Sequence, residues 1–358
     1  MHLEPIGKTP APPRQTRSGW RGRLAAAGIA ATMLGLCAPT AASAEKVVIA
    51  AGSKGPYDAI IYVAQEAGYF AEEGLEPEIV YVNNGAGLTS AIMGGSADLA
   101  TQGITQILRA TAQGGDIIAL SRAFDVQPFP IVVSYEAMKK NGIEDAMSVD
   151  DKLVRLKGLT IGATSPGSTT DGVLRGLLKN RGVNPDSEIS IQYMNASSLY
   201  GAFENKLLDG FVFGAPWSEA AEANGLGKAI FDPFSGEVPE IDGVIYKVIC
   251  TSSATLAAKP DLIKRSMRAL IRAMDLIHTN PEEARKVMRP VFAEMSDDAY
   301  NLMFDKYMVG VPANPELTPD HVIRALDYMV LTESTEVVPV PFEKAVNPAV
   351  VAELVAAN

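Results

Sequence analysis

The sequence has few of the residues that most often carry chemistry or covalent cross-links. Its 358 residues include only two cysteines, Cys37 and Cys250, and three histidines, His2, His278 and His321. Nowhere do Cys and His residues fall at the spacing of a zinc site. Phosphate-binding and dinucleotide-binding glycine motifs are missing, as is the nucleophile elbow Gly-x-Ser-x-Gly. The sequence therefore offers no candidate catalytic residue and predicts no metal and no cofactor.

Hydrophobic runs long enough to cross a membrane are missing too. The apolar run Leu24–Leu36 has 13 residues, fewer than the roughly 20 that a spanning helix needs. Five basic residues precede it and Ala42-Ser43-Ala44 follows it, a pattern typical of a secretory signal peptide over residues 1–44. Cleavage near Ala44 would give a soluble periplasmic chain beginning near Glu45. Because Leu36 is bulky where the residue before a lipid-modified cysteine is small, we expect no lipid on Cys37.

Positive charge is scarce in the expected mature chain. Residues 1–44 hold five of the 31 Lys and Arg residues and one of the 42 Asp and Glu residues, which leaves a formal net charge of −15 on residues 45–358. That charge opposes binding to nucleic acid or to an anionic membrane surface. Cys250 is the single cysteine left, so no intrachain disulfide can form. We expect a monomer that is stabilised by burial.

What the sequence does have is an alternation of short apolar strands and amphipathic helices, in a chain long enough for two domains. Alternating strands and helices predict an α/β fold with mainly parallel sheets and right-handed crossovers. The strands are predicted at residues 47–50, 79–82, 98–100, 117–120, 131–134, 159–161, 189–193 and 244–249, and a further apolar strand is predicted to end at residues 213–219. A helical C-terminal tail is predicted at residues 260–278, 281–288, 297–308, 319–331 and 348–357.

The order of motifs in the first half of the mature chain returns about 110 residues later. Residues 51–55 correspond to residues 163–167, residues 74–78 to residues 182–186, and the predicted strand 79–82 to the predicted strand 189–193. Ala91 and Asp98, seven apart, return as Ala202 and Asp209. Four landmarks in one order predict two α/β lobes of similar winding. We assign residues 45–130 plus 250–358 to lobe 1 and 131–249 to lobe 2, with hinge strands near 130–136 and 244–250.

Polar loops follow several predicted strands, at the sheet edge where ligands collect in parallel α/β proteins. One loop, of the form Ser-x-Gly, occurs twice, and its second copy runs into a helix start rich in hydroxyls. Such a start presents unpaired N–H groups and the positive end of the helix dipole to a ligand, although a hydroxyl there can also merely cap the helix. The candidate ligand-binding residues in these loops are Ser53, Lys54, Tyr57, Asn84, Thr101, Gln102, Ser165, Gly167, Ser168, Thr169, Trp217 and Glu219.

Three of these candidates have simpler alternatives. Lys54 suits an anion, but the favoured interpretation is an ordinary exposed lysine. Trp217 suits ligand contact, but an aromatic residue at the end of an apolar strand also covers a sheet edge. Glu219 could as easily cap the following helix.

Several stretches, taken in order, resemble one family. They are Ala67–Leu75, Met93–Asp98, Asp209–Pro216, Lys259–Ile263 and Asn280–Ala284, and they resemble the nitrate/sulfonate/taurine-type substrate-binding proteins of ABC importers. The resemblance spans essentially the whole mature chain. It implies a two-lobed type II periplasmic-binding-protein fold that closes on a small solute and docks on the transmembrane subunits of an ABC permease.

By the same resemblance, the solute contacts the loops at residues 53–57, 83–85, 101–102, 165–169 and 214–217. None of these loops contains arginine, which weakens a nitrate or sulfonate assignment. Relatives with pyrimidine or aromatic-acid ligands share the same landmarks, so the solute stays open between a small organic molecule and an anion. The favoured interpretation is a transport receptor that is not an enzyme. The alternatives are an enzyme on the same fold that acts on a pyrimidine-like or aromatic metabolite, and a sensory protein that presents its ligand to a receptor.

Overall fold

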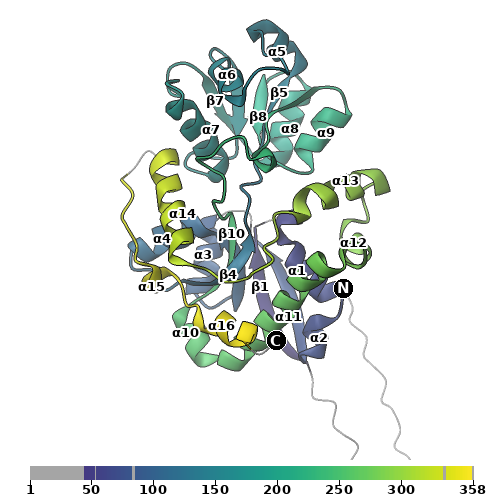
Figure 1. Ribbon diagram of the computed structural model, residues 1–358, viewed down its shortest axis with the longest axis vertical. Helices are drawn as coiled ribbons and strands as arrows, with labels where there is room; N and C mark the ends of the chain where they lie inside the picture. The colour runs from purple at the N-terminus through teal and green to yellow at the C-terminus, as the bar shows by residue number, and fades with distance from the viewer. Residues whose placement is uncertain (1–43, 53, 83–84, 334–335, 357–358) are drawn as a thin grey trace, which may run out of the picture. The chain divides into compact units, whose positions relative to one another are not determined.

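The computed structural model describes residues 44–52, 54–82, 85–333 and 336–356, so nearly all of the predicted signal peptide lies outside the described residues. The described chain contains two five-stranded sheets flanked by helices (Figure 1). Sheet A has the order β2-β1-β3-β10-β4 and consists of β1 (Glu45–Ala51), β2 (Leu75–Tyr81), β3 (Leu99–Gly103), β4 (Ile118–Phe124) and β10 (Lys247–Thr251). Sheet B has the order β7-β6-β8-β5-β9 and consists of β5 (Ile131–Ser134), β6 (Thr160–Ala163), β7 (Ser190–Tyr193), β8 (Gly210–Val212) and β9 (Gly227–Phe231).

Helices connect the strands and form the C-terminal part of the chain. Those before β4 are η1 (Pro56–Asp58), α1 (Ala59–Glu66), α2 (Tyr69–Glu72), α3 (Gly85–Met93) and α4 (Ile104–Ala112). Those between β5 and β10 are α5 (Tyr135–Asn141), α6 (Val149–Val154), α7 (Thr169–Asn180), α8 (Ala196–Glu204), α9 (Trp217–Ala223) and η2 (Pro233–Ser235). The tail has α10 (Ser253–Ala258), α11 (Pro260–Thr279), α12 (Pro281–Met288), η3 (Arg289–Phe292), α13 (Asp297–Met308), α14 (Pro319–Thr332), α15 (Phe342–Ala345) and α16 (Ala349–Ala356).

The prediction of mainly parallel sheets is confirmed, with one reversed strand in each. In sheet A, β1 pairs in parallel with β2 and β3, whereas β10 runs antiparallel to β3 and β4. In sheet B, β6 pairs in parallel with β7 and β8, whereas β5 runs antiparallel to β8 and β9. The chain reaches each reversed strand directly from the other sheet, through residues 125–130 before β5 and residues 232–246 before β10.

Two aspartates of the sequence repeat, Asp98 and Asp209, make equivalent contacts in the two sheets. The Asp98 carboxylate accepts a hydrogen bond from the Val48 backbone N–H at 2.9 Å, and the Asp209 carboxylate accepts one from the Thr160 backbone N–H at 2.8 Å. Each aspartate directly precedes one strand, β3 or β8, and bonds to the neighbouring strand, β1 or β6, with which that strand pairs in parallel. The same side-chain contact therefore joins two strands in each sheet.

Alternating side chains of the central strands enter cores on opposite faces. In β1, Val47 and Ile49 join the core beneath α1 and α11, while Ala50 joins the core beneath α3 and α4. In β5, Ile131 joins the core with α7 and Val132 the core with α8. Helices therefore cover both faces of each sheet, as parallel strands require (Figure 1).

The amphipathic tail helix predicted at residues 260–278 is confirmed as α11, Pro260–Thr279. It buries Ile263, Met267 and Leu270 in the sheet A core, and each such side chain stabilises the fold by about 1.5–3 kcal/mol. Several strand predictions differ from the structure: β2, for example, begins at Leu75 rather than at residue 79, and β4 ends at Phe124 rather than at residue 120. Strand β9 was not predicted, and β10 begins at Lys247 rather than at Val244 because Val244 and Ile245 are buried in the connection instead of paired in the sheet. Among the described residues, no helix has the length and apolar character needed to cross a bilayer.

Candidate ligand-binding site

An open pocket of about 520 Å³ lies at the start of α7, within the range of small-molecule sites. Its walls come from α4, which follows β3 of sheet A, from α7, which follows β6 of sheet B, and from the end of α14. The lining residues are Thr105, Arg109, Pro166, Gly167, Ser168, Thr169, Asp171, Gly172, Arg175, Asp186, Tyr193, Tyr328, Thr332 and Glu333. Three of the predicted ligand-binding residues, Gly167, Ser168 and Thr169, are therefore pocket residues.

Hydroxyl groups fix the loop that enters α7. Ser168 is the N-cap residue, and its hydroxyl accepts a hydrogen bond from the Asp171 backbone N–H and donates one to the Ser165 carbonyl at 2.7 Å. The Thr164 hydroxyl lies 2.9 Å from that of Ser168 and 2.8 Å from that of Thr170. Helix capping by a hydroxyl, the alternative to ligand binding expected from the sequence at this helix start, is thus present at Ser168. It leaves Thr169, the first helical residue, facing the pocket.

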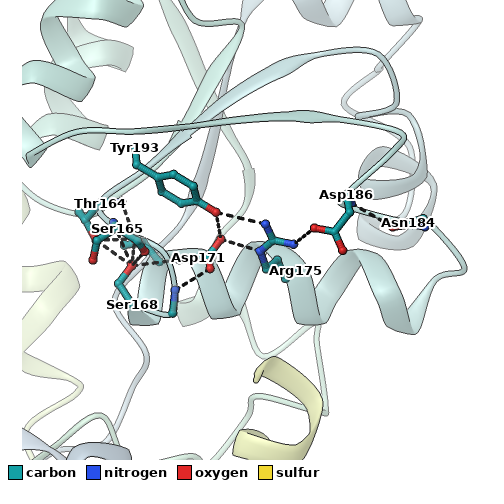
Figure 2. A network of polar contacts seen from close by, with 10 residues as sticks. Thr164, Ser165, Ser168, Asp171, Arg175, Asn184, Asp186 and Tyr193 are labelled. Atoms are coloured by element: carbon teal, nitrogen blue, oxygen red, sulfur yellow. Dashed lines mark hydrogen bonds and ion pairs between the residues drawn. The ribbon is translucent and has the colours of Figure 1, made fainter. Parts of the chain in front are cut away.

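A charged network continues this wall along α7 (Figure 2). Asp171 accepts hydrogen bonds from the Arg175 Nε at 2.8 Å, from the Tyr193 hydroxyl at 2.9 Å and from the Gly167 backbone N–H at 2.8 Å. Arg175 also donates through Nη1 to Asp186 at 2.5 Å and through Nη2 to Tyr193 at 3.2 Å. Burial opposes the charge on Arg175, but these hydrogen bonds with Tyr193, Asp186 and Asp171 raise its pKa. The guanidinium therefore stays charged and is held by groups of its own wall.

The opposite wall combines a second ion pair with a buried hydroxyl. Arg109 of α4 donates through Nε and Nη2 to Oε1 of Glu333, just after α14, at 2.9 and 2.5 Å. Tyr328 of α14 is 3% exposed, and its hydroxyl has no hydrogen-bond partner among the described residues. Burial raises the pKa of that hydroxyl above its ordinary value, so it remains a neutral donor.

Two glycines bring α14 close to α7. An added Cβ would lie 3.1 Å from Cβ of Thr332 at Gly172, and 2.9 Å from Cγ2 of Thr332 at Gly176. Side chains at these positions would push the helices apart. The small residues of α7 thereby set the width of the pocket.

Other predicted residues lie outside the pocket, near the ends of β1 and β3. Lys54 is exposed and pairs with Glu294 at 3.2 Å, as expected for an ordinary surface lysine. Tyr57 is buried, with its ring edge-to-face against Phe124 and Tyr246. Thr101 is buried and donates its hydroxyl to Asp58 at 2.5 Å.

Beneath Tyr57 lies a buried ion pair that also orders this region. Lys247 donates to both carboxylate oxygens of Asp58 at 2.6 and 2.7 Å, and the two side chains are 5% and 0% exposed. The ammonium also lies 5.3 Å from the Tyr57 ring centre. Asp58 belongs to η1 and Lys247 to β10, so the pair joins the helix start after β1 to the reversed strand of the same sheet.

Gln102 at the end of β3 keeps one polar atom unsatisfied. Its side-chain nitrogen donates to the Thr89 hydroxyl at 2.6 Å and to the Gly85 carbonyl at 3.4 Å, but its Oε1 has no partner in the described chain. A buried acceptor of this kind is available to a donor on a ligand. The predicted residues Ser53 and Asn84, in the same region, lie outside the described residues.

The loop after β8 contacts the tail helix α13. The Trp217 ring packs on Tyr200 of α8 at 5.4 Å between ring centres. Glu219 accepts a hydrogen bond from the Tyr307 hydroxyl at 3.3 Å and pairs with Lys306 at 3.6 Å. The Tyr307 hydroxyl also accepts from the Ala215 backbone N–H at 2.8 Å, and burial followed by the charge of Glu219 raises its pKa well above the ordinary value. Neither Trp217 nor Glu219 lines the pocket at α7.

A family model matches residues 42–291, more than half of the chain. This chain belongs to the NMT1-like family.

The fold of this NMT1-like protein is similar to that of solved binding proteins. The ligand-binding component of an ABC-type import system from Staphylococcus aureus superimposes with a TM-score of 0.69 at 15% identity, covering 87% of this chain and 99% of that one. The alkanesulfonate-binding protein SsuA from Xanthomonas axonopodis pv. citri gives 0.65 at 17% identity, covering 85% and 98%. A 4-amino-5-hydroxymethyl-2-methylpyrimidine phosphate synthase from Aspergillus parasiticus is 26% identical over 280 residues, 70% of this chain and 76% of that protein. The fold class and family expected from the sequence are confirmed.

Sequence reasoning missed much of the pocket of this NMT1-like protein. Arg175 and Tyr193 lie beyond the strand-end loops, and Tyr328 and Glu333 lie in the tail, far away in sequence. Arg175 and Asp171 do fall four residues apart on one helix, which is the spacing of a helical ion pair. That spacing could have identified one pair, but no local pattern indicates that α14 reaches α7.

Proposed function

We propose that this NMT1-like protein is an extracytoplasmic solute receptor that captures a small molecule and delivers it to an ABC permease. The observation that carries the proposal is the pocket at α7, whose walls come from helices attached to both sheets. A ligand bound there contacts both parts of the fold at once, so it favours conformations that bring them together. The periplasmic location, the two lobes with their boundaries and the permease partner belong to this proposal.

Two further features support a hinge motion that moves one sheet relative to the other when a ligand binds. Within the described part of the chain, only residues 125–130 and 232–246 lead from a strand of one sheet to a strand of the other. These segments run side by side, because the Tyr246 N–H donates to the Phe124 carbonyl at 2.9 Å and the Gln127 side chain donates to the Ile245 carbonyl at 3.1 Å. Two short paired connections are the arrangement that hinge motion requires.

A solute screen by thermal shift, followed by calorimetry, tests the proposal. A true ligand at 100 times its Kd should stabilise the protein by about 2.7 kcal/mol. Thr169→Val should weaken that ligand, because the hydroxyl at the pocket edge is lost and a ligand hydrogen bond contributes about 0.5–1.5 kcal/mol. Thr255→Val is the matched control, since Thr255 also lies in the first turn of a helix but outside the pocket. Equal weakening by both variants, or no ligand in a broad screen, contradicts a receptor with its site at α7.

An enzyme remains the second candidate, because the pyrimidine phosphate synthase of Aspergillus parasiticus shares 26% identity with this chain. The described residues contain no group of three or more His, Cys, Asp or Glu side chains able to hold a metal. Burial raises the pKa of the Cys250 thiol to about 12, which makes it a poor nucleophile. The discriminating experiment recovers the bound solute after long incubation and measures its mass. Unchanged solute fits a receptor, whereas conversion to a product establishes an enzyme.

A further inference from the structure

The two arginines in the wall of the α7 pocket are already neutralised by carboxylates. Arg175 places all three of its nitrogen atoms on Asp171, Asp186 and Tyr193, and Arg109 donates through two of its nitrogens to Glu333. Among the described lining residues, three carboxylates face two guanidinium groups, so the pocket has one net negative charge. A free oxyanion that bound Arg175 would have to displace Asp171, Asp186 or Tyr193 from its charge-assisted hydrogen bonds.

The start of α7 is likewise less attractive to an anion than a bare helix start. Asp171 lies in the first turn and accepts the Gly167 backbone N–H, so a carboxylate of the chain already occupies this end of the helix (Figure 2). Its charge offsets the positive end of the helix dipole. The wall formed by α7 is therefore polar, and its guanidinium group is already paired with carboxylates of the same wall.

Among the described residues that line this pocket, Tyr328 has a buried polar group that lacks a partner. Its side chain is more than nine-tenths buried and its hydroxyl makes no hydrogen bond within the described chain. An unsatisfied buried hydroxyl is costly and is satisfied by any acceptor that comes within reach. The hydroxyl is shielded from solvent, so an acceptor has to reach it from the pocket that Tyr328 lines.

We propose that this pocket selects an uncharged solute with a carbonyl-type acceptor, which the Tyr328 hydroxyl recognises, and that it rejects free oxyanions. The proposal rests on the receptor function proposed above and names its class of substrate. Three carboxylates repel an anion, while a neutral carbonyl oxygen meets the hydroxyl without breaking either ion pair. Burial keeps the hydroxyl protonated and therefore able to donate.

Tyr328→Phe should change two measured quantities in opposite directions: Tm without ligand should rise, and the affinity for the solute should fall. Without ligand, the variant removes an unsatisfied hydroxyl while keeping the ring, so Tm should rise by about 1–3 °C. With an uncharged carbonyl solute such as nicotinamide, uracil or 2-pyrrolidone, the affinity of the variant should fall about tenfold relative to the wild type. Tyr135→Phe is the control, because Tyr135 is 45% exposed at the start of α5, and it should change neither quantity.

The same calorimetric series includes nitrate, methanesulfonate and taurine as probes. The expected result is no binding of nitrate or methanesulfonate at millimolar concentration, and binding of at least one uncharged solute that depends on Tyr328. A lower Tm for Tyr328→Phe, micromolar binding of either oxyanion, or a bound solute indifferent to the substitution overturns the substrate class while leaving the receptor function intact. A broad screen that yields no ligand of any charge overturns the receptor function itself, and the substrate class with it.

Discussion

At the scale of single residues, the ion pair of Asp58 and Lys247 is the strongest constraint on the strand-end region. Both side chains are buried, and Asp58 also accepts the Thr101 hydroxyl. Lys247→Met should destabilise the protein by about 3–5 kcal/mol, because it leaves a desolvated carboxylate without its counter-charge. Urea unfolding measures the loss.

A surface pair provides the control for that experiment. Lys46 pairs with Glu78, but the two side chains are 62% and 47% exposed, so Lys46→Met should cost no more than about 1 kcal/mol. The double variant Lys247→Met with Asp58→Leu should recover part of the loss, since it removes both buried charges. Equal losses for Lys247→Met and Lys46→Met would show that the buried pair contributes no more than a surface pair.

Asp186 offers a pH-dependent test of the α7 network. Its hydrogen bond with Arg175, followed by the charge of Arg175, lowers the pKa of its carboxyl below the ordinary value. Because the folded pKa lies below the unfolded one, the pair contributes stability above the unfolded pKa of about 3.9, and this is lost as pH falls through the folded pKa. Carboxyl NMR should show the midpoint of Asp186 rising towards 3.9 in Arg175→Met. An unchanged midpoint would mean that the ion pair is absent in solution.

Individual residues differ in how far the sequence could predict them. Asp98 and Asp209 were found because each lies next to a strand and one follows the other at the offset of the repeat, and each accepts a hydrogen bond from the backbone of a neighbouring strand, β1 or β6. Thr169 followed from the helix start. Tyr328 could not be found in this way, because its position depends on packing between helices whose first residues are 150 apart in the chain.

At the scale of elements, the contact of α7 with α14 depends on a missing side chain. A Cβ at Gly176 would lie 2.9 Å from Cγ2 of Thr332 and 3.3 Å from the Leu331 carbonyl oxygen. Gly176→Ala should therefore destabilise the protein by about 1–3 kcal/mol despite the better helix propensity of alanine. Solute affinity should fall as well, because α14 forms one wall of the pocket.

Gly201 in α8 is the matched control, since a Cβ there would have no atom within 4 Å. Gly201→Ala should raise the free energy of unfolding by roughly 1 kcal/mol through propensity alone. Opposite signs for the two glycine variants support the close contact. A gain for both would show that α14 yields to the added methyl group.

Long elements were easier to predict than short ones. The tail helices α11 to α14 were predicted to within one residue because their apolar faces and their Pro or Asp starts are local signals. Strand β9 is five residues long and starts with glycine, so its pattern is too weak to stand out. Its place at the edge of sheet B comes from pairing with β5, which no local pattern encodes.

At the scale of the whole molecule, ligand binding should be visible in a single tryptophan. Of the two tryptophans, Trp20 lies in the predicted signal peptide and Trp217 starts α9. Trp217 lies two residues before Glu219, which α13 contacts through Tyr307 and Lys306. Closure of the two sheet regions should alter this contact and shift the Trp217 emission in a saturable way, while small-angle scattering reports a smaller radius.

Trp217→Phe is the control for the optical signal and should still show compaction by scattering. Compaction with constant emission in the wild type would mean that Trp217 only covers the sheet edge beside Tyr200. A bound solute with neither change would contradict the hinge.

The reversed strands also have a consequence for how the chain is made. Sheet A cannot acquire the strand between β3 and β4 until residues 247–251 exist, because β10 fills that place. A ribosome that has produced only the first half of the protein therefore holds a segment with an open gap in its sheet. Contacts this distant in sequence form slowly, since a long loop has to close first. If the protein is exported as proposed, that delay keeps the nascent chain incompletely folded. A fragment that ends before β10 should therefore be degraded by proteases and should not fold as an independent domain.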